Sequence, residues 1–450
     1  MGTTPTTLEI DDTDPGRACL YRFRADLRDV SRHTVHVLEL FPETAAVEDG
    51  ELVLGGVRAT VLAEEFGTPL VVYCERTLIG QAREYQRVDP EALVVYGTKA
   101  FANVALLQLF AREGLGADVS TLGELRFALR ADVPSDRIVF HGNNKSDEEL
   151  RAAARAGATV VLDAPDEVER ASNAGVERVL VRLTPGVEAE THESIQTAHS
   201  ESKFGLDPDQ ALATVAAARG RLDAAGVHVH IGSQLARIDE SLAAVDRLVE
   251  FCTRCRDQLG WSPRIVDLGG GLGVRHARAD QLPTVAEFAG ALVTRFREGW
   301  NEPARLILEP GRSLIGRAGV TLYRVGATKR SGSIDYVAID GGMSDNPRPQ
   351  LYGARYEALI ANKAEERVDG VYRIAGKHCE SGDVLIDAVE LPRPRGGDLL
   401  AVPATGAYTL SMASNYNGVP RPAAVIVADG KARLIRRRET VDDLLRYETS

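Results

Sequence analysis

The feature that most limits how this chain can fold is an alternation of short apolar runs with helical stretches across residues 93–312. Each run ends in a polar or glycine-containing loop, and stretches rich in Ala, Leu, Arg and Glu, such as residues 148–156 and 241–259, separate many of them. Strands that alternate with helices pair in parallel through right-handed crossovers. Eight such units predict an α/β fold, a (β/α)8 TIM-like barrel. The eight runs begin at Leu93, Ala117, Ile138, Thr159, Val179, Val227, Ile265 and Arg305.

After about residue 320 the pattern changes to strands separated by turns. The segments YVAIDGG, YRIAGKHC, DVLIDAVEL and DLLAVPA contain little helical sequence, and Asp429-Gly430 between AAVIVA and KARLI favours a hairpin. Near the N-terminus, VHVLEL and LVLGGV are also interpreted as strands. We therefore expect an N-terminal segment that joins a β-domain (residues 1–69), the barrel (residues 70–320) and a mainly β C-terminal domain (residues 321–450).

Charge and composition exclude several classes of partner. The chain has 53 Lys and Arg against 65 Asp and Glu, a formal charge of −12, which disfavours broad binding to nucleic acid or to an anionic membrane. Residues 92–111 carry only one charge, that of Lys99, but polar residues divide them into a strand and a helix, so no membrane span is expected. The N-terminus does not resemble a secretory signal.

The five cysteines are few and odd in number, as in a reducing, cytoplasmic compartment. Cys252 and Cys255 form a C-x-x-C pair, but the surrounding sequence is that of an amphipathic helix and no second Cys/His pair lies nearby. We therefore expect two helical cysteines and no metal site.

Polar residues gather where the barrel strands are expected to end, which is where barrels of this type place their functional groups. Any one of these positions could be incidental, but their shared location indicates a site. They are Lys99, Asp118, Ser120, His141, Asn143, Asn144, His230, Ser233, Gly269-Gly270-Gly271 and Glu309-Pro310-Gly311-Arg312.

Four of these positions suggest particular chemistry, each with a plainer alternative. Lys99 follows an apolar strand, so burial should lower its pKa and free the amine for a Schiff base, although a lysine at a strand end can also simply reach solvent. The triple glycine suits an anion or only a tight turn. Glu309 could keep a pyridine nitrogen protonated or form a structural ion pair. Of His228 and His230, one is expected in the core and one against a flat cofactor.

The β-domain adds the segment KHCESGD (residues 377–383) and GAY (residues 406–408). Cys379 beside Glu380 and Asp383 suits a proton donor better than a resting nucleophile, because acidic neighbours raise a thiol pKa.

Together, the motifs YGTKAF, HGNNK, THESIQTAH, KFGL, HIGSQ, DLGGGLG, EPGR, DGGMSDN, KHCESGD and ATGAY resemble the fold-type III pyridoxal-phosphate (PLP) enzymes, and most closely their diaminopimelate decarboxylase family. The resemblance implies that Lys99 carries PLP as a Schiff base and that His230 stacks on its ring. It implies that Gly269, Gly270, Gly271, Glu309, Pro310, Gly311, Arg312 and Tyr408 hold the cofactor. It also implies that Cys379 is an acid supplied by the partner subunit of a homodimer.

The substrate follows from a second set of residues. The resemblance implies that Arg312, Arg348 and Tyr352 hold the distal carboxylate of meso-2,6-diaminopimelate, that Glu380 holds its distal ammonium, and that Tyr408 contacts substrate. Guanidinium groups suit a carboxylate. The expected reaction is decarboxylation to L-lysine and CO2, the last step of lysine biosynthesis.

Several positions depart from the family pattern. Gly97-Thr98, Ser194, the segment after HIGSQ, and His276, where a tyrosine is usual, could reshape the substrate loop. A paralogue acting on a related amino acid, a racemase, a non-catalytic PLP-binding homologue and a barrel that binds another phosphate ester stay open as alternatives.

Overall fold

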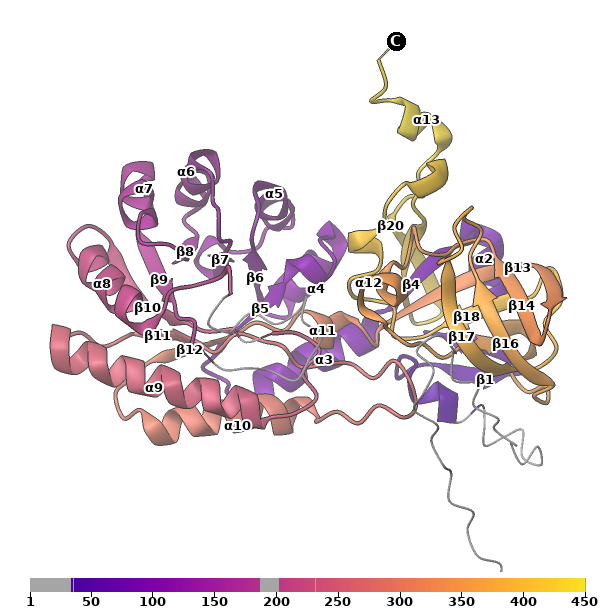
Figure 1. The fold of residues 1–450 in the computed structure, drawn as a ribbon, viewed down its shortest axis with the longest axis horizontal. Coiled ribbons are helices and arrows are strands. Elements are labelled where there is room, and N and C mark those ends of the chain that lie inside the picture. The colour runs from indigo at the N-terminus through magenta and orange to yellow at the C-terminus, as the bar shows by residue number, and fades with distance from the viewer. Residues whose placement is uncertain (1–33, 35, 187–201, 231, 450) are drawn as a thin grey trace, which may run out of the picture.

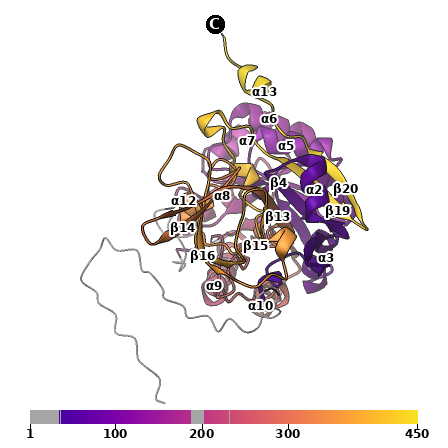
Figure 2. The same cartoon turned by 90° about the vertical axis from the view of Figure 1, so that its right-hand side faces the viewer.

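The structure, a computed structural model, describes residue 34 and residues 36–186, 202–230 and 232–449. Figure 1 shows a barrel of strands with helices around it and, beside it, a second part built mainly of strands. In both views the short C-terminal helix α13 (Val441–Leu445) projects away from the rest of the chain (Figure 1 and Figure 2). The expected combination of a TIM-like barrel and a β-domain is confirmed.

Eight parallel strands close the barrel in chain order, and the last strand pairs with the first. Val95, Val139 and Ile307 belong to the cluster that fills its interior, whereas the alternate residues Val94 and Tyr96 pack outward into the core beneath the helices. The eight strands are β5 (Leu93–Gly97), β6 (Gly116–Val119), β7 (Ile138–Phe140), β8 (Thr159–Leu162), β9 (Arg178–Arg182), β10 (Asp223–His228), β11 (Ile265–Asp267) and β12 (Arg305–Leu308). Seven of the eight strands begin within one residue of their predicted start, whereas β10 begins at Asp223, four residues before the predicted Val227.

Helices around the barrel begin and end at residues that satisfy their free backbone groups. Ser146 and Glu149 form a capping box at the start of one helix, and Gly157, with φ of 68°, ends it in the left-handed conformation. The helices of this part of the chain are α3 (Glu75–Val88), α4 (Val104–Arg112), α5 (Leu122–Arg130), α6 (Asp147–Ala156), α7 (Glu167–Ala174), α8 (Pro208–Arg219), α9 (Asp239–Leu259), α10 (Val285–Gly299) and α11 (Arg312–Ile315).

The second part is a nine-stranded mixed sheet that takes strands from both sides of the barrel segment. One strand, β4 (Leu70–Cys74), pairs antiparallel with β13 and parallel with β19. The expected boundary at residue 70 assigned this strand to the barrel, whereas its hydrogen bonds place it in the sheet. The other strands are β13 (Gly319–Ser331), β14 (Ile334–Ile339), β15 (Leu359–Ile360), β16 (Gly370–Ala375), β17 (Val384–Leu391), β18 (Leu399–Val402), β19 (Ala423–Ala428) and β20 (Lys431–Arg436).

The hairpin predicted at Asp429-Gly430 joins β19 to β20, and both turn residues have positive φ, 49° and 74°. Asp-Gly favours this turn because both residues tolerate positive φ and the resulting twist matches that of the strands. The short helix α12 (Arg348–Tyr352) lies between β14 and β15.

The N-terminal region differs from its prediction in one run. Residues 36–38 of VHVLEL are helical, and Val37 and Phe41, four residues apart, are both buried, which is the spacing of a helix rather than a strand. The run LVLGGV does form strands, within a separate sheet of β1 (Ala46–Glu48), β2 (Glu51–Leu54) and β3 (Val57–Arg58), followed by α2 (Ala59–Phe66). Side chains of this sheet share a core with the mixed sheet.

Two further expectations concern single segments. Residues 92–111 divide into strand β5 and helix α4, and among the described residues no helix has the length and apolar character needed to cross a bilayer. Cys252 and Cys255 are buried free thiols on α9, which confirms that they are helical cysteines.

Candidate active site

A cavity of about 290 Å³ lies at the carboxyl ends of the barrel strands. Most of its lining follows strand ends, and two tyrosines come from the C-terminal part of the chain. It brings together six of the predicted site residues: Lys99, His230, Glu309, Arg312, Tyr352 and Tyr408. The remaining lining residues are Asp118, Ser120, His141, Gly142, Arg182, Phe204, His228, Gly232 and Ser233.

Lys99 lies in the turn η1 (Thr98–Ala100) directly after β5, with its side chain 50% exposed and its Nζ 3.8 Å from Oδ2 of Asp118. Burial lowers the pKa of the Lys99 ammonium, but the negative charges of groups led by Asp118 outweigh burial and raise the pKa above its ordinary value. The expectation of a lowered pKa is therefore wrong for the protein alone. The expectation took account of the apolar strand before Lys99, but not of the Asp118 carboxylate at the end of the neighbouring strand.

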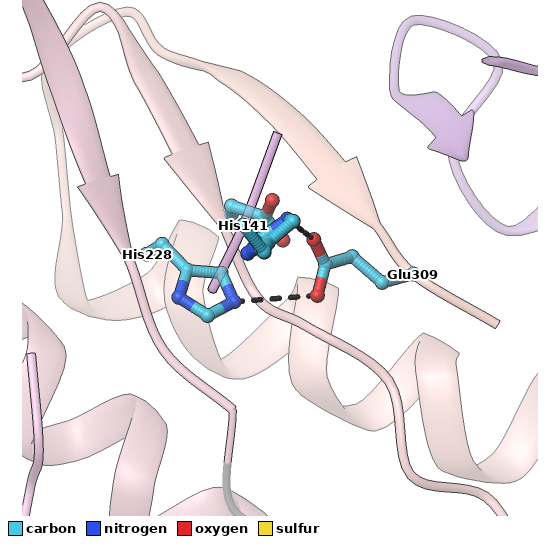
Figure 3. A group of neighbouring side chains, drawn as sticks. His141, His228 and Glu309 are labelled. Atoms are coloured by element: carbon cyan, nitrogen blue, oxygen red, sulfur yellow. Dashed lines mark hydrogen bonds and ion pairs between the residues drawn. The ribbon is translucent and has the colours of Figure 1, made fainter. Parts of the chain in front are cut away.

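The Glu309 carboxylate faces two imidazole rings, those of His141 and His228 (Figure 3). Its Oε1 is 2.6 Å from Nε2 of His141, and its Oε2 is 3.2 Å from Nε2 of His228. Burial favours the protonated acid, but the two histidines outweigh it and hold the pKa of Glu309 well below its ordinary value. Burial lowers the pKa of His228 to about 4, so this ring is neutral at pH 7 and donates its Nε2–H to the carboxylate. Glu309 is thus an ionised carboxylate without a full positive charge on His228.

Asp267 completes this buried group from the end of β11. Burial, and then the negative charge of Glu309, raise the pKa of Asp267 well above its ordinary value. Of the two carboxyl groups, Asp267 therefore carries a proton and Glu309 does not. Ligand atoms of His141, His228, Asp267 and Glu309 lie within 4.8 Å of one another, a spacing that could hold a metal ion. Within this group, His141 and His228 each contact Glu309 through Nε2.

The triple glycine allows three loops to pack against one another. A Cβ on Gly269 would lie 2.4 Å from the carbonyl oxygen of Val229, and one on Gly270 would lie 2.2 Å from that of Glu309. The N–H of Gly269 donates to Asp267 and that of Gly270 to Nδ1 of His230. The glycines are therefore required by close backbone packing, and they leave a surface without side chains beside His230.

Arg312 is buried, with 6% of its surface exposed. Its Nη2 donates to Oγ of Ser233 over 3.2 Å, and its guanidinium carbon lies 4.5 Å from the centre of the Tyr408 ring. Burial, reinforced by the positive charge of Arg348, lowers the pKa of Arg312 to about 10. The side chain stays cationic at pH 7.

Arg348, the first residue of α12, is a second buried guanidinium, 4% exposed. Its Nη1 donates to Nε2 of His276 over 2.7 Å and to the hydroxyl of Tyr356 over 2.6 Å. Nη1 of Arg312 and Nε of Arg348 have no hydrogen-bond partner within the described part of the chain. Two buried cations thus lie near each other with neutral neighbours, an arrangement that favours an added anion.

Comparison with known proteins identifies the family of the chain. The sequence model described as "Pyridoxal-dependent decarboxylase, pyridoxal binding domain" matches residues 75–316. The chain is 42% identical over 423 residues to a diaminopimelate decarboxylase of Bacillus subtilis (strain 168), covering 89% of this chain and 96% of that protein. It is 43% identical over 434 residues to the Mycobacterium tuberculosis protein of the same name, covering 90% and 96%.

The chain belongs to the diaminopimelate decarboxylase family. Pyridoxal phosphate is the cofactor of this family.

Solved structures agree with this assignment. The chain matches a diaminopimelate decarboxylase from M. jannaschii in complex with L-lysine with a TM-score of 0.85 and 35% identity, over 91% of this chain and 98% of that one. A lysine/ornithine decarboxylase from Vibrio vulnificus, complexed with cadaverine, has a TM-score of 0.72 at 23% identity and shows only the shared fold.

Among the predicted site residues outside the cavity lining, two belong to the sheet domain and lie on its surface. The others outside the lining are Gly269, Gly270, Gly271, Pro310, Gly311 and Arg348. Cys379 and Glu380 are exposed on the segment between β16 and β17. A buried contact fixes the segment, because Nδ1 of His378 lies 2.6 Å from the buried Asp383 carboxylate. The N–H of Cys379 donates to Oδ1 of Asn417, and the hydroxyl of Tyr416 donates to Glu380. A folded, exposed loop therefore presents these two side chains to the outside of the chain.

Sequence reasoning missed two lining residues of the decarboxylase cavity. Arg182, the last residue of β9, is 7% exposed, pairs with Asp163 and places its guanidinium 4.6 Å from the centre of the Phe204 ring. Its position at a strand end could have identified Arg182 by the same rule that selected Lys99. Phe204 follows no strand end, but it stands in the KFGL motif of the family resemblance, which could have identified it. Ser194 lies outside the described residues.

Proposed function

We propose that this chain uses PLP to decarboxylate meso-2,6-diaminopimelate at its D-centre, giving L-lysine and CO2. The observation that carries the substrate assignment is the pair of buried guanidiniums, Arg312 and Arg348. Each has neutral neighbours and one N–H without a partner among the residues that the structure describes. A substrate with a distal carboxylate supplies the missing negative charge. A diamine-forming reaction on lysine or ornithine offers only a distal ammonium, which two arginines would repel.

The residues around the cavity fit PLP. Lys99 offers an amine to the cofactor aldehyde, and ionised Glu309 is suited to keep a proton on the ring nitrogen. The side-chain-free surface formed by the triple glycine, with Pro310 and Gly311 at the start of α11, suits the phosphate. His230 lies beside this surface and suits a stacking role, and Tyr408 completes the wall. The bound cofactor supplies an electron sink for the carbanion left by CO2.

The chain's own residues supply orientation and protons. Arg312 and Arg348 fix the distal carboxylate and thereby decide which of the two amino-acid centres reaches Lys99. Tyr352 lines the cavity from the same helix as Arg348 and closes this end of it. Because Asp118, 3.8 Å from Nζ, raises the pKa of the Lys99 ammonium, a Lys99 side chain that is not bonded to the cofactor would hold a proton beside the cavity.

Cys379 and Glu380 enter the proposal through a second copy of the chain. We place Cys379 as the proton donor to the reacting carbon and Glu380 as the partner of the distal ammonium, both in the cavity of the other subunit of a homodimer. The support is their exposure on an ordered loop outside their own cavity. We place this dimer in the cytoplasm, where the free thiols of Cys74, Cys252, Cys255 and Cys379 would stay reduced.

The test is CO2 release by the purified protein with PLP from meso-diaminopimelate, run beside L-lysine, L-ornithine and L-arginine. Release from diaminopimelate alone, with L-lysine formed in equal amount, is the expected result. Release from another amino acid would overturn the substrate assignment and keep the PLP chemistry. Racemisation without CO2 release would overturn both the substrate and the reaction.

A further inference from the structure

His276 has no role in the function described so far, yet it is a direct hydrogen-bond partner of Arg348, one of the two buried arginines. It follows the loop after β11, is 6% exposed, and accepts a hydrogen bond from Nη1 of Arg348 over 2.7 Å. The ring is fixed on its other sides. Its backbone N–H donates to Asp280, and the Tyr356 ring lies edge-on at 5.3 Å between centroids.

The charge state of His276 follows from its surroundings. Burial, and then the positive charges of Arg348 and Arg312, lower the pKa of His276 well below its ordinary value, while a hydrogen bond at the Val274 backbone opposes them weakly. A neutral ring that accepts at Nε2 carries its proton on Nδ1. The arginine is thus held by a neutral acceptor.

A neutral acceptor has a consequence for binding that a carboxylate would not have. An aspartate or glutamate beside Arg348 would orient it but would also neutralise the charge that an incoming carboxylate needs. The hydroxyl of Tyr356, the other partner of Nη1, is neutral as well. His276 and Tyr356 both accept from Nη1 of Arg348. Nε of Arg348 is therefore left without a partner among the described residues.

We propose that His276 is a positioning residue for substrate specificity: it fixes the Arg348 guanidinium without neutralising it and so reserves that cation for the distal carboxylate of the substrate. The inference rests on the proposed function, because it presumes a substrate with such a carboxylate. It assigns no contact between His276 and the reacting atoms. Its effect belongs in binding of the carboxylate and not in the chemical step.

The experiment compares two ligands that differ in one group. The product L-lysine keeps the distal carboxylate and cadaverine lacks it, so their inhibition constants against diaminopimelate turnover report on the arginine pair alone. We measure both constants, KM, kcat and the visible absorbance of bound PLP in wild type, His276→Phe, His276→Asn and His276→Gln. Phe removes the acceptor, Asn is too short to reach Arg348, and Gln retains an acceptor of similar reach.

We expect His276→Phe and His276→Asn to raise KM and the L-lysine inhibition constant by about tenfold, the effect of losing one hydrogen bond to a charged group. The cadaverine constant, kcat and the PLP absorbance should stay within about twofold of wild type, and His276→Gln should restore KM. An unchanged KM in His276→Asn, or an equal loss of affinity for L-lysine and cadaverine, would overturn the inference. If wild type itself releases no CO2 from diaminopimelate, the proposed function has failed rather than this inference.

Discussion

The cavity at the barrel mouth and the Cys379 loop contain the two groups of predicted site residues, and they differ in almost every physical respect. In the cavity, Glu309 is buried, ionised and contacted by two histidines. On the loop, Cys379 and Glu380 are exposed, although His378 and Asp383 beneath them are buried and paired. The barrel thus contains the groups suited to hold a cofactor, whereas the sheet domain presents its groups outward. The comparison teaches that one chain places its two groups of predicted site residues in opposite environments, one buried and one exposed.

Replacing Lys99 tests whether the cavity contains the reaction. Lys99→Ala should lower kcat/KM by about a thousandfold or more, because the covalent amine is removed, and should abolish the visible absorbance of bound PLP. Absorbance spectra and CO2 release measure both effects. Lys377→Ala, which removes an exposed lysine beside Cys379, is the matched control and should retain the cofactor spectrum. Wild-type absorbance in Lys99→Ala would contradict the assignment.

Mixing two inactive variants tests the sharing of sites. Lys99→Ala lacks the cavity group and Cys379→Ala lacks the loop group, so a mixed dimer contains one intact site. After dissociation and reassociation in equal amounts, activity should rise to about a quarter of wild type, because about half of the dimers are mixed and each has one of two sites intact. This is about 250-fold or more above the Lys99→Ala parent. No recovery, despite mixed dimers demonstrated by mass, would place Cys379 outside its partner's site.

Removing Arg348 tests the electrostatic part of the cavity. Arg348→Ala should lower kcat/KM for diaminopimelate by about fiftyfold, mostly through KM, since it removes a charged hydrogen-bond donor to the substrate. Steady-state kinetics measure the change. Arg355→Ala is a suitable control, because Arg355 lies nearby in sequence but its side chain is 76% exposed. Equal losses in the two variants would indicate a general effect of charge.

The smallest predicted effect is a loss of folding stability at low pH. It concerns His228, which is buried beside Glu309 in the cavity. The pKa of His228 is about 4 in the folded protein and about 6.5 when unfolded. Between these values the unfolded chain binds a proton that the folded chain does not, so stability falls as the pH falls. From pH 7 to pH 5 this costs the folded state about 2 kcal/mol.

His228→Gln should therefore lose less stability between pH 7 and pH 5 than wild type does. Urea unfolding of the PLP-loaded protein at the two pH values measures this difference, independently of any constant loss from the substitution. His36→Gln is the control, because the His36 side chain is 58% exposed. An unchanged pH dependence in His228→Gln would mean that His228 is not the buried neutral base.

The strands of the barrel were predictable because their signals are local. Each run of β-branched residues near Val95 or Val139 is short, is followed by a loop, and is buried on both faces, so its apolar character does not depend on which neighbour covers it. The strand prediction for VHVLEL was wrong because an apolar run of this length fits the period of a strand or of a helix. Val37 and Phe41 are both buried, which is the spacing of a helix. Strand β4 was misplaced because its partners, β13 and β19, come from far along the chain.

The sequence by itself determined the barrel, the strand-end positions of Lys99 and Glu309, and a family resemblance specific enough to name cofactor and substrate. Tertiary structure alone decided the charges: Asp118 beside Lys99 reversed the expected pKa shift, and two histidines, not an arginine, surround Glu309. It also decided that Cys379 and Glu380 face outward. The physical reason is range. Strand and helix periodicity arise between residues a few positions apart, whereas the energy of a buried charge depends on whatever groups the fold brings within a few ångströms of it.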